Sequence, residues 1–366
     1  MTAVLTFQVE NKCPIILGDL LLSGLQVSDR KVFVPTDVNI RDIFPSGSKF
    51  VPVALQQKIV VISDNLVIGW SGNYLNAKDV IRDLYAENES SQLTLHSLNS
   101  FFRSIPQHYW EAGLGFVGFI KDQNGIGRFG FHYESLKTEK FGKVGFLGTG
   151  SNDLEELVSK FSGELIKPLS GQPNILEISI SYALAITGVL LNVELSTFST
   201  LKKFYGGGYE IAALINGKFQ KLDGVVYSFW TANVSKNSVQ ISRTPLHSMS
   251  IGYEDDILLI RSTSFNKNEP LSIDESGYAI LPMNMKKIVP DNEIRSLKLP
   301  DLNQKWHCNY FLVKKDSGET EIYCRIDYRP RIDRGVLFHN EQNKTIVSVQ
   351  KEFIESVAEQ IYRKFL

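Results

Sequence analysis

The sequence predicts an α+β fold in which β-hairpins and pairs of helices alternate along the chain. Three observations indicate this class. Short apolar runs are separated by turn residues, as in antiparallel strands. Apolar residues recur at helical spacing in several other segments. The composition, with 43% hydrophobic and 22% charged residues, is that of an ordinary globular protein.

Two hairpins are predicted at the start of the chain. Ala3–Val9 and Ile15–Gly18 have the pattern of strands, and Asn11–Pro14 forms the turn between them. Lys58–Ile62 and Leu66–Trp70 form a second pair, joined by the turn-forming residues Ser, Asp and Asn. Both pairs are therefore expected to lie in antiparallel sheets.

Two helices and further strands follow these hairpins. Apolar residues at helical spacing predict a helix around 75–84, and Thr94 is a suitable N-cap for a second helix that reaches Ile105. A third hairpin is expected within 115–133, followed by a strand at 144–147. The order so far is strands, two helices, strands.

A second pair of helices and one more hairpin come next. Asn152 or Asp153 is expected to cap the third helix, and a longer apolar helix runs from about Ile175 to Leu195. Asn216 and Gly217 supply the turn of the hairpin that follows.

The pattern changes near residue 226. From there, short strands separated by turns predominate, Asn266–Glu275 reads as a polar loop, and Lys351–Leu366 is an amphipathic helix. A chain of 366 residues is also longer than one hydrophobic core usually serves. We therefore expect two domains, at residues 1–225 and 226–366, the second β-rich.

Charge and cysteine content limit the partners and the location. The 39 basic and 40 acidic residues give a formal charge of −1, so no overall field favours nucleic acid or an anionic membrane. The three cysteines are scattered, and the first twenty residues lack the pattern of a secretion signal. The longest apolar stretch, Ile178–Val193, contains polar residues. We expect a soluble, cytoplasmic protein that binds neither nucleic acid nor membranes.

Several motifs occur in the order in which proteasome β subunits carry them. Thr2–Val9 is similar to the mature start of those subunits, and Ile15–Asp19 resembles the strand that ends in their aspartate. Lys58–Gly72 resembles the hairpin that runs from their active-site lysine to their oxyanion glycine. The turn Gly148–Gly150 and the segment Tyr205–Gly208 match two glycine-rich turns. The N-terminal part therefore resembles the proteasome β-subunit family and its bacterial relatives, which are N-terminal nucleophile (Ntn) hydrolases.

The resemblance implies a four-layer αββα sandwich and a chemical centre. Once Met1 is removed, Thr2 would be the nucleophile, and its own α-amine would accept the hydroxyl proton. Lys58 would favour the alkoxide and the neutral amine, and Asp19 would hold the Lys58 ammonium. The backbone N–H of Gly72 would stabilise the oxyanion. Thr149 would offer a hydroxyl where the family has a serine. This chemistry requires no cofactor and no metal.

The sequence also departs from the family pattern. The segment between Asp19 and Lys58 is much longer than in the family. Lys203 and Gly206 stand where a supporting aspartate and serine are expected. Trp70 stands where a smaller residue usually lines the first specificity pocket, which implies a shallow or filled pocket.

Each candidate residue has a structural interpretation as well. Thr2 can be a strand residue behind a retained Met1, Asp19 a turn residue, and Lys58 a charge at a strand edge. Gly125–Gly130 has the spelling of a dinucleotide fingerprint, but it joins two predicted strands and opens no helix. The histidines and cysteines lack the paired spacing of a zinc site.

Two functions follow from this sequence. The first is a threonine-type amide hydrolase, a peptidase that cleaves a peptide or protein through an acyl-enzyme on Thr2. The alternative is a catalytically inactive, proteasome-like scaffold, sensor or protein-interaction module, which the missing supporting residues, the long insertion and the C-terminal domain favour. A homo-oligomer is expected if these additions leave the ring-forming helical faces open.

Overall fold

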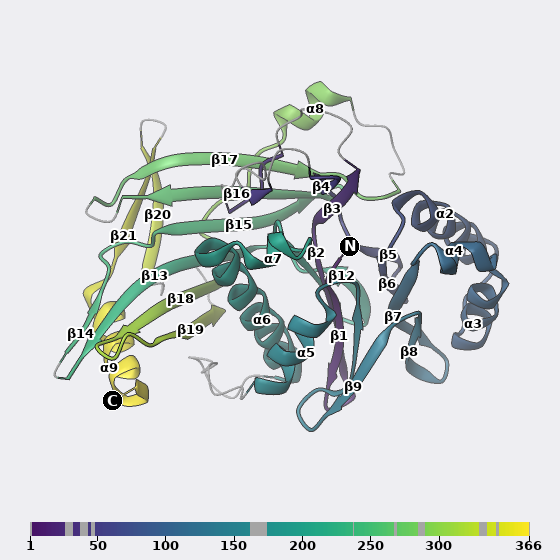
Figure 1. Cartoon of the computed structure of the whole chain (residues 1–366), viewed down its shortest axis with the longest axis horizontal. Helices are drawn as coiled ribbons and strands as arrows, with labels where there is room; N and C mark the ends of the chain where they lie inside the picture. Colours follow the sequence, from purple (N-terminus) through teal and green to yellow (C-terminus); the bar gives the residue numbers. More distant parts are fainter. Residues whose placement is uncertain are drawn as a thin grey trace.

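In the computed structural model, the chain has a mixed α+β fold in which most neighbouring strands are antiparallel (Figure 1). The structure describes residues 2–25, 32–36, 43–44, 48–161, 174–236, 238–266, 269–284, 290–328, 335–341 and 344–365.

A six-stranded antiparallel sheet contains the start of the chain. Its order is β12-β11-β2-β1-β10-β9, and β1 is central because Leu5 pairs with Leu17 on one side and Phe146 on the other. The strands are β1 (Val4–Val9), β2 (Cys13–Asp19), β9 (Glu134–Thr138), β10 (Gly142–Leu147), β11 (Tyr209–Ile215) and β12 (Lys218–Lys221). Strands far apart in sequence therefore meet beside the N-terminus.

A four-stranded sheet packs against the six-stranded one. Its strands follow the chain in the order β5 (Ile59–Ser63), β6 (Leu66–Ser71), β7 (Gly115–Asp122) and β8 (Gly125–Phe131). The apolar cluster between the sheets contains Val4 and Ile16 from one sheet and Ile59 and Val67 from the other. The sheets approach closely at Gly69, where an added Cβ would lie 2.7 Å from Val4 Cγ1. A larger residue at position 69 would force the sheets apart.

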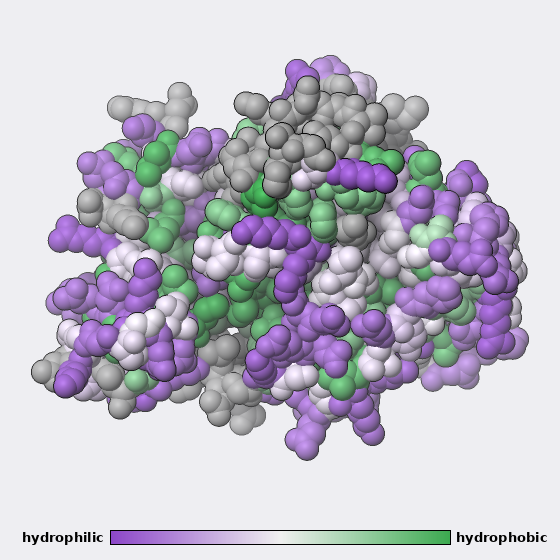
Figure 2. Space-filling view, in the orientation of Figure 1, coloured by the Kyte–Doolittle hydropathy of each residue, from purple (hydrophilic) through white to green (hydrophobic). Residues whose placement is uncertain are grey.

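Helices α2 (Tyr74–Ser90) and α3 (Leu95–Ser104) cover the four-stranded sheet, and the short α4 (Gln107–Glu111) follows them. Trp70, Leu84 and Phe102 belong to the cluster that joins these helices to the sheet. The predicted cap at Thr94 is confirmed, since its side chain accepts a hydrogen bond from the Ser97 amide at 3.2 Å. Hydrophilic side chains predominate on the outer surface of this helical region, at the right of Figure 2.

Helices α5 (Ser151–Lys160) and α6 (Ile175–Thr197) pack on the six-stranded sheet, and α7 (Ser199–Lys202) follows α6. Among the described residues, α6 is the one helix with the length and hydropathy of a membrane span, and 67% of its apolar window is buried inside the protein. That degree of burial is typical of a core helix.

A second large sheet, of seven strands, covers the other side of α6 (Figure 1). Its order is β17-β16-β15-β13-β18-β19, with β14 paired to β13, and the β13–β18 pair is parallel. Tyr310 donates a hydrogen bond to the Leu184 carbonyl at 2.6 Å, and a Cβ at Gly188 would lie 1.8 Å from its ring. Gly188 therefore lets this sheet sit directly on the helix. The strands are β13 (Val225–Ser235), β14 (Ser238–Ile241), β15 (His247–Glu254), β16 (Ile257–Phe265), β17 (Ser272–Ile280), β18 (Trp306–Lys315) and β19 (Thr320–Tyr328).

One hydrophobic core crosses the predicted boundary at residue 225. The same cluster contains Leu5 and Leu184 from the N-terminal part and Tyr227, Met249 and Tyr310 from the C-terminal part. The seven-stranded sheet thus shares its core with the N-terminal part.

Smaller elements complete the structure. The hairpin β20 (Val336–Glu341) and β21 (Lys344–Val349) and helix α9 (Lys351–Phe365) contribute to a cluster with Trp230 and Phe311 of the seven-stranded sheet. The long segment before Lys58 contributes the pair β3 (Leu21–Leu25) and β4 (Phe50–Leu55). Helix α8 (Asp291–Ser296) follows β17 along the chain.

Some sequence predictions were wrong in detail. Helix α5 begins at Ser151 with Gly150 at the N-cap, so neither Asn152 nor Asp153 caps it. Residues 272–275 of the predicted polar loop belong to β17, and residues 267–268 lie outside the described residues. The C-terminal strands are also longer than expected, since β13 has 11 residues. Leu366, the predicted end of the last helix, is outside the described residues as well.

Candidate active site

Thr2 lies against the turn between β10 and α5. It is buried, and its carbonyl accepts a hydrogen bond from the Gly150 amide at 3.1 Å. Gly148 has a φ of +87°, and a Cβ there would lie 2.1 Å from the Thr2 carbonyl oxygen. Only glycine fits this approach. The turn predicted from the sequence is therefore beside Thr2, with Thr149 exposed at its middle.

Asp19 ends β2 and ties the start of the chain to a distant loop. Its carboxylate accepts hydrogen bonds from the amides of Ala3 at 2.9 Å, Leu21 at 3.2 Å and Gly206 at 3.0 Å. Burial raises the pKa of Asp19 to about 6, although the nearby Lys58 ammonium and these hydrogen bonds favour the charged form. Asp19 is thus a buried carboxylate that binds the backbone amide of Ala3, the residue after Thr2.

Lys58 immediately precedes β5 and is also fully buried. Its side chain starts beside β2, because a Cβ at Gly18 would lie 3.2 Å from the Lys58 Cβ. Among the described residues its Nζ has no hydrogen-bond partner, and it lies 4.4 Å from the centre of the Trp70 ring. Burial lowers the pKa of Lys58 to about 8, against the opposing effect of Asp19 and Glu210.

Gly72 follows β6 and has a φ of +98°. An added Cβ would lie 2.3 Å from the Gly113 carbonyl oxygen, so this contact by itself requires glycine. The structure therefore brings Asp19 and the turn that contains Thr149 against the first residues of the chain. The charges of Lys58 and Asp19 act on each other, but the Lys58 Nζ donates no hydrogen bond to Asp19 or Thr2, so the prediction that Asp19 holds this ammonium directly was wrong. Gly72 has a structural contact of its own.

A second buried carboxylate, Glu194 of α6, adjoins the candidate site. It accepts hydrogen bonds from Thr36 at 2.8 Å, from Thr200 at 3.2 Å and from the Gly207 amide at 2.9 Å. Burial raises the pKa of Glu194 to about 7, and repulsion from Asp19 adds to the rise. Sequence reasoning missed Glu194. The available signal was an acidic residue in the last turn of a long apolar helix, where a carboxylate is unfavourable with respect to the helix dipole.

Lys203 and Tyr205 lie between α7 and the three glycines that precede β11, and both bind Asp153 of α5. Lys203 Nζ is 2.8 Å from Asp153 Oδ1, and the Tyr205 hydroxyl donates to Asp153 Oδ2 at 2.6 Å. Lys203 therefore supplies the cation of an ion pair with Asp153.

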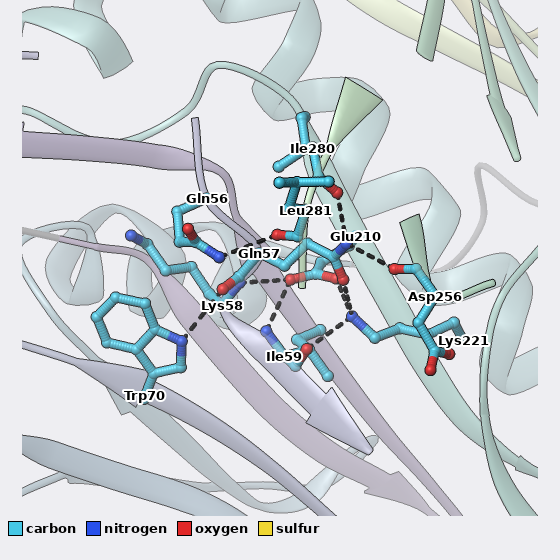
Figure 3. A network of polar contacts seen from close by, with 10 residues as sticks. All are labelled: Gln56, Gln57, Lys58, Ile59, Trp70, Glu210, Lys221, Asp256, Ile280 and Leu281. Atoms are coloured by element: carbon cyan, nitrogen blue, oxygen red, sulfur yellow. Dashed lines mark hydrogen bonds and ion pairs between the residues drawn. The ribbon is translucent and has the colours of Figure 1, made fainter. Parts of the chain in front are cut away.

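On the other side of Lys58 lies a fully bonded polar network (Figure 3). Glu210 accepts hydrogen bonds from the backbone amides of Lys58 at 2.5 Å and Ile59 at 2.7 Å, and it forms an ion pair with Lys221. Figure 3 shows the Lys58 side chain extending away from this network and over Trp70. The Lys58 backbone is therefore held by Glu210, while its ammonium points elsewhere.

The C-terminal part reaches this site through two glutamines (Figure 3). Gln57 donates to the carbonyls of Asp256 at 2.8 Å and Ile280 at 2.7 Å, and Gln56 donates to that of Leu281 at 3.0 Å. A cavity of about 730 Å³ lies beside this contact, between α2 and residues 281–284. The cavity lining includes Gln56, Tyr74, Lys78, Tyr85, Leu281 and Met283.

No protein-family model matches the sequence, and no curated protein matches it. In the part of the chain that the structure describes, no three His, Cys, Asp or Glu side chains gather as they would to hold a metal ion.

Proposed function

We propose that the chain is an amide hydrolase of the N-terminal nucleophile class, a peptidase whose nucleophile is Thr2 after removal of Met1. The observation that carries this proposal is the Lys58 ammonium, which is buried beside Asp19 with no hydrogen-bond partner among the described residues. Burying a charged group in this way is costly, and such groups are concentrated at sites that use them.

The packing of the elements supports a proteasome-like domain over residues 1–225. The six-stranded and four-stranded sheets pack face to face, and each carries a pair of helices on its outer face. That arrangement suits a four-layer αββα sandwich, to which the seven-stranded sheet is added on the far side of α6.

In the proposed reaction, Thr2 supplies both the hydroxyl that loses a proton and the α-amine that accepts it. Its hydroxyl oxygen attacks the carbonyl carbon of the scissile amide, and its α-amine takes the hydroxyl proton. Lys58, whose pKa of about 8 keeps it mostly charged at neutral pH, stabilises the forming alkoxide. The proton passes to the leaving amine as the C–N bond breaks, which gives an ester on Thr2. Water then hydrolyses this ester.

Gly72 and Thr149 have supporting roles in the proposal. An amide hydrogen from Gly72 would stabilise the oxyanion, and the exposed Thr149 hydroxyl would bind the substrate backbone or the Thr2 amine. The cavity between α2 and residues 281–284 is large enough for a substrate side chain. The substrate would be a peptide or protein in the cytoplasm, and the enzyme would act alone or as a homo-oligomer.

A specific observation favours the second candidate, a non-catalytic scaffold or sensor. Thr2, Asp19 and Lys58 are all buried, and the Trp70 ring occupies one side of the Lys58 ammonium. A scaffold would keep this arrangement closed, whereas an enzyme must admit substrate to Thr2.

Intact-mass analysis of protein made in cells, before and after treatment with an electrophilic threonine probe, separates the two functions. The enzyme is expected to lack Met1 and to gain one probe mass on Thr2. The Thr2→Ala variant is expected to gain none, and Thr149→Ala to be labelled more slowly. Retention of Met1, or equal labelling of wild type and Thr2→Ala, would exclude the hydrolase.

A further inference from the structure

Glu194 is held by both of its carboxylate oxygens. Oε1 accepts from the Thr36 hydroxyl, while Oε2 accepts from the Thr200 hydroxyl and the Gly207 amide. Glu194 is fully buried, and Thr36 and Thr200 are nearly so. The contacts come from three places in the chain: the segment between β3 and β4, helix α7 and the loop before β11. This carboxylate is therefore a junction between those segments.

The glycine loop joins Glu194 to Asp19. The Gly206 amide donates to Asp19 Oδ2 at 3.0 Å, and the next amide, that of Gly207, donates to Glu194 Oε2 at 2.9 Å. Gly206 has a φ of +110°, and an added Cβ would lie 2.2 Å from Glu194 Oε2. The two carboxylates thus hold consecutive amides of one loop, and a shift of Glu194 moves the donor on which Asp19 depends.

The two carboxylates also interact through their charges. Repulsion from Asp19 contributes to the raised pKa of Glu194. The other titratable groups that act on this pair are Lys58 and the amino terminus, which favour the charged form of Asp19, and the buried phenols of Tyr205 and Tyr209. The pair therefore gains negative charge as the pH rises through neutrality.

We propose that Glu194 is a positioning residue for Asp19, and that Thr36 holds Glu194 in place from the long segment between β3 and β4. The catalytic meaning of this inference rests on the proposed function, in which Asp19 binds the amide of Ala3 beside Thr2 and its charge acts on the Lys58 ammonium. It gives the candidate site a support where Lys203 and Gly206 replace the aspartate and serine of the family pattern. It also gives the segment between Asp19 and Lys58 a role in the site.

The first test measures how fast the electrophilic probe labels Thr2 between pH 5 and 9. Glu194→Gln and Thr36→Val are expected to slow labelling between roughly 10-fold and 100-fold, because a small displacement of a catalytic group has effects of that size. Glu194→Gln should also change the shape of the pH profile between pH 5 and 8, since one of two coupled titrations is removed. Thr36→Ser, which keeps the hydroxyl, should restore the rate.

Matched controls come from the contact between β21 and β17, where the Thr345 hydroxyl donates to the Glu275 carboxylate. Glu275→Gln and Thr345→Val make the same chemical changes far from Thr2, and they are expected to leave labelling unchanged. If folded Glu194→Gln and Thr36→Val label at the wild-type rate and with the wild-type profile, the inference is wrong.

A second test does not depend on catalysis. Urea unfolding of Glu194→Gln, Asp19→Asn and the double variant forms a double-mutant cycle. At pH 8 the midpoint shift of the double variant should differ from the sum of the single shifts, and at pH 5, where repulsion is relieved, the difference should shrink. Additive shifts at pH 8 would overturn the coupling of the two carboxylates. If the wild type is not labelled but the cycle is non-additive, the proposed function fails and the structural coupling stands.

Discussion

The two lysines near the start of β5 have opposite surroundings. Lys221 Nζ donates to Gln57 Oε1 at 3.0 Å and to the Ile59 carbonyl at 2.6 Å, and it is paired with Glu210 (Figure 3). Lys58 Nζ is more deeply buried and has no hydrogen-bond acceptor among the described residues. One ammonium is thus fully bonded, while its neighbour relies on the Trp70 ring and on the charges of Asp19 and Glu210.

This difference separates structural charges from candidate chemical ones. A buried ion pair with satisfied hydrogen bonds resists the removal of either partner, because the remaining charge is then buried alone. A buried charge without hydrogen bonds costs stability, so folding does not explain its presence. The contrast therefore assigns the Glu210–Lys221 network to the fold and leaves Lys58 as a candidate for chemistry.

The largest expected effect is that of Lys221→Met. This change leaves the Glu210 carboxylate buried without its cation, and we expect the free energy of unfolding to fall by about 3 to 5 kcal/mol. Urea denaturation measures the loss. Lys218→Met is the control, because Lys218 forms an exposed ion pair with Asp64 and should change stability by less than about 1 kcal/mol. Equal losses of stability in the two variants would show that the Lys221–Glu210 pair is not a structural ion pair.

The pH dependence of stability tests the other side of the comparison. The pKa of Asp19 in the folded state, about 6, lies above its ordinary value of 3.8, so between these pH values the folded state binds more protons than the unfolded state. The raised pKa of Asp19 therefore adds about 3 kcal/mol to the free energy of unfolding. This stabilisation is complete below pH 4 and is lost as the pH rises through 6. Lys58, with its pKa lowered from 10.5 to about 8, has the opposite sign: its burial destabilises the protein below pH 8, and the penalty disappears by pH 10.5.

These two contributions can be isolated by subtraction. Urea unfolding of wild type, Asp19→Asn and Lys58→Met is measured from pH 4 to 10. The difference between wild type and Asp19→Asn should vary between pH 4 and 6, and that between wild type and Lys58→Met between pH 8 and 10. Parallel curves across the whole range would show that neither group is perturbed.

The smallest expected loss of stability is that of Lys58→Met. The substitution removes a buried charge and breaks no hydrogen bond among the described residues, so the free energy of unfolding below pH 8 should not fall and is expected to rise. Labelling of Thr2 by the electrophilic probe should be lost in the same protein. A stability loss as large as that of Lys221→Met would mean that Lys58 belongs to the structural network.

Local patterns predicted much of the fold. Alternation and turn residues indicated the first two hairpins, and the caps and spacing indicated α2, α3 and α6. The resemblance to proteasome β subunits singled out Asp19 and Lys58, whose charges act on each other in the structure. These features depend on neighbours in the chain, which a single sequence displays.

The features that were missed depend on distant contacts. Nothing near Glu194 in sequence announces Thr36, and nothing near Gln57 announces the carbonyl of Ile280. The strands β3 and β4 were missed because they pair across a long segment of the chain. In each case the partner is set by the packing of separate sheets, which periodicity alone does not contain.

Helix α6 is synthesised well before the strand β18 that covers it. The helix ends at Thr197, whereas β18, whose Tyr310 rests on Gly188, begins only at Trp306. While the ribosome makes the intervening chain, one apolar flank of α6 has no cover, and apolar surface exposed in this way attracts other nascent chains and chaperones. The shared core can therefore be completed only after β18 has been synthesised, and until then the N-terminal part exposes an apolar surface prone to aggregation.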